Sequence, residues 1–130
     1  MKKKILISSG GSGGHVIPAT IFYEHLKNKF DVFFTVDKRG AKFLNLEKYK
    51  VTVIDTPKLT NNLFLLSLNF FGFFVSIIKS LIFFKKNKID ILISTGGYMS
   101  LPFCIIAKII NIKIYLFEPN MVLGRANNFF

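Results

Sequence analysis

Five short apolar runs alternate with longer segments of helical character along this chain, and that alternation most constrains its fold. The runs are rich in Ile, Val, Leu and Phe, and several end at glycine or proline, as buried strands do. The intervening segments carry their apolar residues at helical spacing. We therefore expect strands over residues 4–8, 31–36, 51–54, 89–94 and 113–117, and helices over residues 19–29, 41–48, 62–87 and 100–110.

The predicted strands are apolar on both faces, which is typical of a parallel sheet covered by helices. Their order predicts an α/β domain with a doubly wound parallel sheet. Ligands of such sheets lie at the carboxyl ends of the strands. The loops over residues 9–18, 37–40, 95–102 and 118–124 share that edge, so a binding site is expected there. Residues 125–130 are expected to begin another helical segment.

The longest helical segment has the length of a membrane span. Residues 63–84 are almost free of charge, and a helix of that length covers about 33 Å, close to the thickness of a bilayer core. Its polar and small residues recur every three or four positions, so they form one stripe along the helix. A polar stripe that includes a lysine is unfavourable in a lone membrane-spanning helix. A crossover helix touching a membrane interface is favoured over plain core packing and over a true span. The stripe consists of Asn69, Gly72, Ser76, Lys79 and Ser80.

The composition narrows the class of protein. The formal charge is +11, with 18 Lys and Arg against 7 Asp and Glu. A nucleic acid or an anionic membrane surface would complement this charge, and a Lys-rich coding bias would also produce it. A hydrophobic content of 51% excludes a disordered chain. The lone Cys104 excludes a disulfide scaffold and a cysteine-based metal site.

Three lysines open the chain, but the apolar run after them is too short for a signal peptide, so we expect a cytoplasmic protein.

Two glycine-rich loops follow predicted strands. Residues 10–15 read Gly-Gly-Ser-Gly-Gly-His and precede a predicted helix. Glycines let the backbone approach a ligand closely, and a helix N-terminus favours anions. Neither the P-loop nor the dinucleotide pattern is present, because His15 stands where a lysine is needed and Val16 where a third glycine is needed. Residues 95–102, Thr-Gly-Gly-Tyr-Met-Ser-Leu-Pro, form a second glycine-rich loop between a predicted strand and a predicted helix. We expect the two loops to bind two phosphate-bearing groups, or to contact one ligand from two sides.

These motifs resemble those of the MurG family of N-acetylglucosaminyltransferases. The residues that carry the resemblance are the loop over 10–15 with Pro-Ala at 18–19, Gly-Gly-Tyr-Met-Ser-Leu-Pro over 96–102, and Glu-Pro-Asn over 118–120. Two departures are visible. Ser12 stands where the family usually has Thr, and Phe-Glu-Pro-Asn over 117–120 stands where it usually has His-Glu-Gln-Asn. The resemblance covers the whole chain and matches the N-terminal half of the family.

The resemblance implies a Rossmann-like, N-terminal domain of a GT-B glycosyltransferase over residues 1–130, without the C-terminal donor domain. The implied function is inverting transfer of N-acetylglucosamine from UDP-N-acetylglucosamine to an undecaprenyl-pyrophosphate-linked muramoyl-pentapeptide (lipid I to lipid II) in peptidoglycan synthesis. Peripheral attachment to the cytoplasmic face of the inner membrane, on its anionic surface, and a donor-binding domain or subunit as partner are also implied. No cofactor, metal or nucleic acid is expected. The alternative is a noncatalytic membrane-docking subunit of a split N-acetylglucosaminyltransferase.

The resemblance also implies roles for single residues. A neutral imidazole is favoured at a helix N-terminus, so His15 is a candidate base, with hydrogen bonding to the loop or to a pyrophosphate as its alternative. Glu118 is the second catalytic candidate, by orienting His15 or binding sugar hydroxyls, and bracing of the loop is its alternative. The candidates for binding UDP-N-acetylglucosamine are Ser12, Gly13, Gly14 and Asn120, and those for binding the acceptor and its pyrophosphate are Gly96, Gly97, Tyr98 and Ser100.

Overall fold

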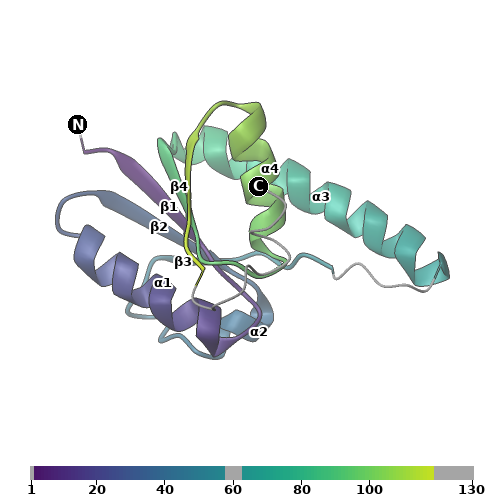
Figure 1. Ribbon diagram of the computed structural model, residues 1–130, viewed down its shortest axis with the longest axis horizontal. Helices are drawn as coiled ribbons and strands as arrows, with labels where there is room; N and C mark the ends of the chain where they lie inside the picture. Colours follow the sequence, from purple (N-terminus) through teal and green to yellow (C-terminus); the bar gives the residue numbers. More distant parts are fainter. Residues whose placement is uncertain (1, 58–62, 119–130) are drawn as a thin grey trace.

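The structure is a computed structural model that describes residues 2–57 and 63–118, with the backbone alone for residues 63–68. Apart from Glu118, the segments predicted over residues 118–130 lie outside the described residues. Strands and helices alternate through the described part of the chain (Figure 1). In chain order they are β1 (Lys4–Ser8), α1 (Gly13–Leu26), β2 (Asp31–Val36), α2 (Lys38–Ala41), β3 (Val51–Val53), α3 (Leu63–Asn87), β4 (Ile91–Ser94), α4 (Ser100–Ile109) and β5 (Lys113–Leu116).

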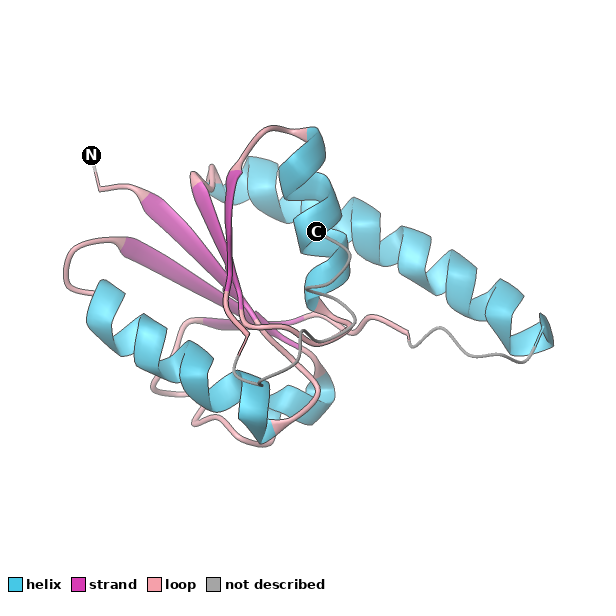
Figure 2. Ribbon diagram, viewed as in Figure 1, coloured by secondary structure: helices cyan, strands magenta, loops and turns pink. Residues whose placement is uncertain are grey.

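The strands form one parallel sheet in the order β3-β2-β1-β4-β5. The central strand β1 pairs with β2, where Lys4 lies opposite Asp31, and with β4, where Ile5 lies opposite Ile91. Helix α1 covers one face of the sheet, and α3 and α4 cover the other (Figure 2). The predicted doubly wound parallel sheet is therefore confirmed, and all five predicted strands are present within one or two residues of their expected bounds.

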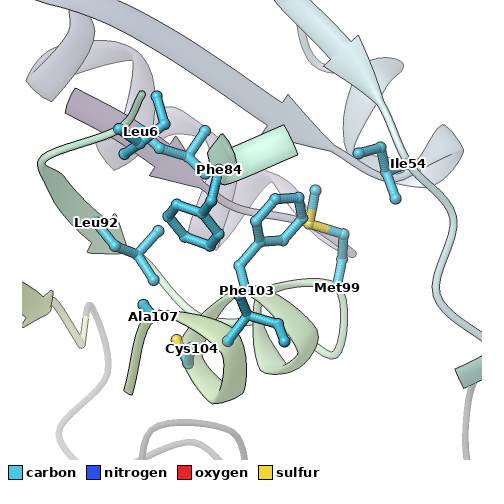
Figure 3. Packing of buried hydrophobic residues seen from close by; sticks show 10 residues of the cluster. Leu6, Ile54, Phe84, Leu92, Met99, Phe103, Cys104 and Ala107 are labelled. Atoms are coloured by element: carbon cyan, nitrogen blue, oxygen red, sulfur yellow. The ribbon is translucent and has the colours of Figure 1, made fainter. Parts of the chain in front are cut away.

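Alternate residues of β1 pack into separate cores on the two faces of the sheet. Ile5 and Ile7 belong to the cluster beneath α1, whereas Leu6 belongs to the cluster beneath α3 and α4. In this second cluster the buried rings of Phe84 and Phe103 meet edge to face, with centroids 5.9 Å apart (Figure 3). Burying one such side chain stabilises a fold by about 1.5–3 kcal/mol. The sheet thus needs helices on both faces, as its two-sided apolar strands predict.

Helix α1 begins earlier than predicted. It starts at Gly13 rather than near residue 19, so two glycines occupy its first turn although glycine is a poor helix former. Pro18 lies inside the helix and not in its first turn. Because proline has no N–H, the carbonyl of Gly14 loses its usual partner four residues later. His15 consequently belongs to the first turn of the helix instead of the end of the loop.

The helix predicted over residues 41–48 is wrong. Helix α2 is a single turn that ends at Ala41. Asp37 caps this turn, because its Oδ1 accepts the backbone N–H of Gly40 at 2.8 Å. Beyond it, the side chain of Asn45 accepts the backbone N–H of Glu47 at 3.1 Å. Such local side-chain bonds offer the backbone an alternative to the helix and produce a run of turns here.

The serines of the polar stripe of α3 face the protein, whereas Lys79 of that stripe is exposed. Ser76 is buried, and its hydroxyl donates to the carbonyls of Gly72 at 3.0 Å and Asp55 at 3.2 Å. Ser80 is also buried and donates to the carbonyl of Ser76 at 2.8 Å. A Cβ on Gly72 would lie 2.8 Å from the ring of Pro57. The stripe is therefore the packing face on which the segment after β3 meets the helix.

The opposite side of α3 carries apolar side chains that face water. Their exposed fractions run from 43% at Ile78 to 70% at Phe71. The N-terminal part of the helix projects beyond the sheet (Figure 1). In the described part of the chain, no helix has the length and apolarity needed to cross a bilayer. We call this surface the outer face of α3, and it comprises Phe70, Phe71, Phe74, Ile78 and Ile82.

Candidate functional site

The two glycine loops lie against each other at the carboxyl edge of the sheet. Strands β1 and β4 are neighbours, but the helices that follow them, α1 and α4, cover opposite faces, so the gap between these strands is the switch point of the sheet. Gly97 has a φ of 89°, and a Cβ on it would clash with the carbonyl oxygen of Gly10. Only glycine allows this approach. Ligands of doubly wound sheets bind in the crevice at this point.

His15 joins the two loops through a reciprocal pair of hydrogen bonds. Its Nδ1 lies 2.7 Å from the carbonyl oxygen of Thr95, and the hydroxyl of Thr95 donates to the carbonyl of His15 at 2.9 Å. Because a carbonyl only accepts, Nδ1 must carry the proton in this contact. In the neutral imidazole, Nε2 is then the unprotonated nitrogen with an available lone pair. The fold thereby selects the tautomer of a half-buried histidine at the switch point.

A buried carboxylate braces the first glycine loop. Asp37 follows β2 and is 4% exposed. Its Oδ1 accepts the backbone N–H groups of Gly11 at 2.9 Å and Gly40 at 2.8 Å. Its Oδ2 accepts from Nε of Arg39 at 3.0 Å and from Nη2 at 2.9 Å. Many dinucleotide folds use an acid at the end of the second strand to bind a ribose. Here that acid is committed to the loop, which agrees with the absence of the dinucleotide pattern.

Three of the predicted donor-site residues form the start of α1. Ser12 precedes the helix in extended conformation, and its carbonyl accepts the N–H groups of His15 and Val16, both at 3.1 Å. The Ser12 side chain makes no capping hydrogen bond to the helix, and the first turn holds no acidic residue. A Cβ on Gly14 would approach only the Ser12 hydroxyl, at 3.8 Å. The partial positive charge of this helix start is thus available to an anion at the switch point.

The predicted acceptor-site residues form the β4–α4 loop. The N–H of Gly96 donates to Ser94 Oγ at 3.3 Å, and Gly97 makes the close approach described above. Ser100 is buried, and its hydroxyl donates to the carbonyl of Gly97 at 2.7 Å, so its described contact stabilises the loop itself. Tyr98, which lies between Gly97 and Ser100 in the sequence, is half-buried. The structure therefore brings these four residues to the same edge as His15.

The third motif reaches the site only in part. The backbone N–H of Phe117 donates to the carbonyl of Ser94 at 2.8 Å, which continues the pairing of β5 with β4 towards the carboxyl edge. Glu118 follows it and is half-buried. Asn120 lies outside the described residues. Within the described ranges, no three His, Cys, Asp or Glu side chains gather as metal ligands would.

The sequence marks Asp37 and Thr95 only by their places directly after predicted strands, and Thr95 also as the first residue of the second glycine loop. An acid that ends a buried strand and stands three residues before a glycine was the available signal for Asp37. The contact between His15 and Thr95 spans 80 residues of sequence, so it depends on the pairing of β1 with β4. These two residues are the braces of the site.

Comparison with known proteins decides the family. Residues 5–130 match the model of the glycosyltransferase family 28 N-terminal domain. The chain belongs to glycosyltransferase family 28. The predicted resemblance is thereby confirmed at the level of the family, and the match includes both glycine loops of this family 28 domain.

The family 28 domain has similar relatives among curated transferases. It is 60% identical, over 130 residues, to a UDP-N-acetylglucosamine–N-acetylmuramyl-(pentapeptide) pyrophosphoryl-undecaprenol N-acetylglucosamine transferase of Pelagibacter ubique, covering 100% of this chain and 36% of the relative. A transferase of the same name from a Wolbachia of Brugia malayi is 33% identical over 97% of this chain and 35% of its own length. The chain thus spans about a third of these relatives.

A solved structure supports the fold. The crystal structure of MurG from Acinetobacter baumannii superposes with a TM-score of 0.82 at 22% identity, over 97% of this chain and 38% of that one. At this sequence identity the structural similarity shows the fold alone. The predicted fold, the N-terminal Rossmann-like domain of a GT-B glycosyltransferase, is confirmed.

Proposed function

We propose that this chain supplies the acceptor-binding half of an inverting N-acetylglucosaminyltransferase. The reaction moves N-acetylglucosamine from UDP-N-acetylglucosamine to an undecaprenyl-pyrophosphate-linked muramoyl-pentapeptide, lipid I to lipid II, in peptidoglycan synthesis. The observation that carries this proposal is the 60% identity to the Pelagibacter transferase, which runs through the entire chain. In this scheme residues 1–130 form the acceptor domain, and a donor domain or subunit outside this sequence holds most of the UDP-sugar.

The proposed chemistry uses His15 as the base. A hydroxyl of the acceptor sugar attacks the anomeric carbon, the bond to UDP breaks, and UDP leaves with the electron pair while the configuration inverts. The attacking hydroxyl must lose its proton. With Nδ1 donating to the carbonyl of Thr95, Nε2 of His15 is the nitrogen that accepts this proton. Glu118 is proposed to act at the same edge, by orienting the imidazole or by holding sugar hydroxyls.

Negative charge develops on the diphosphate of the departing UDP, and the proposed site stabilises this charge with fixed dipoles. The N–H groups of Gly13 and Gly14, the first two of α1, have no partner within the helix, so they are suited to this task. Ser12, Gly13, Gly14 and Asn120 are proposed to contact the donor. Gly96, Gly97, Tyr98 and Ser100 are proposed to contact the acceptor and its pyrophosphate.

We further propose that the outer face of α3 attaches the protein peripherally to the anionic cytoplasmic face of the inner membrane. Large apolar side chains lie on this face, and Lys85 and Lys86 follow in the last turn of the helix. Apolar area inserted at the interface and basic residues near anionic headgroups both favour such binding. The same observation supports the second candidate function, a noncatalytic membrane-docking subunit of a split enzyme.

A domain exchange tests the proposal. Residues 1–130 replace the matching third of the Pelagibacter transferase, and transfer of radiolabelled N-acetylglucosamine to a lipid-linked acceptor is measured. We expect turnover by the chimera and none by residues 1–130 alone. A folded chimera without turnover contradicts the catalytic proposal. If that chimera still binds anionic vesicles, the docking-subunit alternative replaces it.

A further inference from the structure

A buried negative charge lies against the first glycine loop. The side chain of Asp37 is 6% exposed, whereas that of its ion-pair partner Arg39 is 45% exposed. Water therefore reaches the guanidinium but hardly reaches the carboxylate. A carboxylate removed from water is strongly unfavourable unless a cation and hydrogen bonds compensate for it. Among the described residues, Arg39 supplies that cation, with Nη2 at 2.9 Å from Oδ2.

The packing around Asp37 fixes its charge at the loop. A Cβ on Gly10 would lie 3.1 Å from Oδ1 of Asp37 and equally close to Cβ of Met99. A Cβ on Gly40 would lie 3.0 Å from the same oxygen. A side chain at either position would press on the carboxylate, so both glycines make room for it. Together with the hydrogen bonds to both of its oxygens, this packing holds the charge away from solvent.

The charge of Asp37 is close to the place where an anion would bind. Its Oδ1 accepts the N–H of Gly11, two residues before α1 begins at Gly13. Two residues of chain span at most about 7 Å, so the carboxylate and an anion at the helix start are separated by about one Debye length at physiological salt. Nη2 of Arg39 lies at the same loop, 3.6 Å from where a Cβ of Gly11 would be. Without this cation, the carboxylate would repel the anion.

We propose that Arg39 is a positioning residue that cancels the charge of Asp37, so that the carboxylate braces the first glycine loop without repelling a diphosphate bound there. Arg39 acts on the ligand through Asp37 and does not contact it. The inference rests on the proposed function, whose donor and acceptor each carry a diphosphate. It makes the affinity for these substrates depend on a residue outside both glycine loops.

Lys38, in the same helix α2, provides a contrast. Its Nζ lies 2.9 Å from Oδ2 of Asp55, and these two side chains are 81% and 46% exposed. Water screens both charges, and exposed pairs of this kind have little energetic effect. Lys38→Gln and Arg39→Gln each remove one positive charge from neighbouring positions. Only Arg39→Gln leaves a buried carboxylate without its cation, so Lys38→Gln is the matched control.

The test uses the chimera described above and measures the KM for UDP-N-acetylglucosamine and the KM for the lipid-linked acceptor separately. Repulsion by an uncompensated buried charge is expected to raise at least one KM of Arg39→Gln by about tenfold at low salt. The rise is expected to shrink as salt is added, because salt screens the repulsion. The substrate whose KM rises carries the diphosphate nearer to Asp37. Lys38→Gln is expected to leave both KM values unchanged.

A double variant separates neutralisation from direct contact with the ligand. Asp37→Asn combined with Arg39→Gln removes both charges, and the amide oxygen still accepts the N–H groups of Gly11 and Gly40. We expect both KM values to return to within about twofold of those of the unsubstituted chimera. A guanidinium that contacted the diphosphate itself would leave the double variant as weak as Arg39→Gln. Arg39→Lys keeps the charge and is expected to keep both KM values.

A rise in KM with Arg39→Gln that is reversed in the double variant and absent from Lys38→Gln supports the inference. Unchanged KM values in Arg39→Gln, an equal rise in Lys38→Gln, or a double variant that stays weak overturns it. If Arg39→Gln does not fold, the double variant and Arg39→Lys decide. Normal KM values in both then support the inference, and a raised KM in either overturns it.

The inference and the proposed function fail separately. Turnover by the unsubstituted chimera, with KM unchanged in Arg39→Gln, removes the role of Arg39 and leaves the proposed function standing. A chimera without turnover removes the proposed function. The same variants are then compared by their Kd for inorganic pyrophosphate, where the same loss and recovery would support the role of Arg39 and their absence would overturn it.

Discussion

The switch-point site and the outer face of α3 differ in how closely their residues are packed. At the switch point, glycines bring two backbones together, and the buried Asp37 has a hydrogen-bond partner on each oxygen. On the outer face, Phe70 and Phe71 stand 67% and 70% exposed with nothing packed over most of their surface. The polar groups of Asp37 are satisfied by hydrogen bonds within the domain, whereas the outer face of α3 leaves large apolar side chains in contact with water. We take the first as the chemical site and the second as the docking surface.

The largest expected effect tests the chemical side of this comparison. In the chimera, His15→Ala removes the proposed base, so kcat should fall by about 10²–10⁴-fold. The variant loses one hydrogen bond to Thr95, which is worth about 0.5–1.5 kcal/mol of stability. Steady-state kinetics and thermal unfolding of the same sample check both numbers. A kcat near that of the unsubstituted chimera would remove His15 from the mechanism.

Two glycine substitutions sharpen the geometric side of the comparison. Gly97→Ala places a methyl group against the carbonyl of Gly10 at a positive φ, and we expect it to cost about 3 kcal/mol or more of unfolding free energy. Gly14→Ala is the matched control, because its Cβ would lie in a helical turn at an ordinary van der Waals distance, 3.8 Å, from the Ser12 hydroxyl. It should be neutral or stabilise by about 0.5–1 kcal/mol. Urea unfolding of both variants measures the difference, and equal losses would contradict the close approach of the loops.

Much of this contrast is visible in the sequence. Both glycine loops, their shared edge and the polar stripe of α3 follow from local patterns, because strand and helix periodicities fix which residues share an edge or a face. The early start of α1 does not follow, because Gly13 and Gly14 oppose helix formation and tertiary packing overrides their propensity. The brace by Asp37 and the hydrogen bonds between His15 and Thr95 depend on contacts between loops that only the folded sheet brings together.

A pair of aromatic substitutions tests the docking side. Phe70→Ser with Phe74→Ser removes exposed rings, so the stability should change by only about 0.5 kcal/mol per site. Burying one Phe in an interface is worth about 1.5–3 kcal/mol, so affinity for anionic vesicles should fall by about tenfold or more. Vesicle sedimentation measures this loss. Unchanged sedimentation would show that the outer face does not meet the membrane.

The smallest expected effect comes from a surface that belongs to neither region. On α1, hydrogen bonds from Lys27 and then Lys48 lower the pKa of Glu24 to about 2. Its folded-state pKa is below the unfolded one, so its contribution is present above pH 4.5 and is lost as the pH falls towards 2. The difference in Tm between the unsubstituted chain and Glu24→Gln should shrink over that window. A difference that stays constant with pH would contradict the ion pairs.

The most direct test of the division between chemical site and docking surface measures one reaction in two media. The chimera, its His15→Ala variant and its Phe70→Ser, Phe74→Ser variant each transfer N-acetylglucosamine to an acceptor held in detergent micelles or in anionic vesicles. We predict that His15→Ala loses turnover in both media, while the aromatic variant loses it only with vesicles. Loss of turnover by the aromatic variant in micelles, or normal turnover by His15→Ala in either medium, would contradict the account.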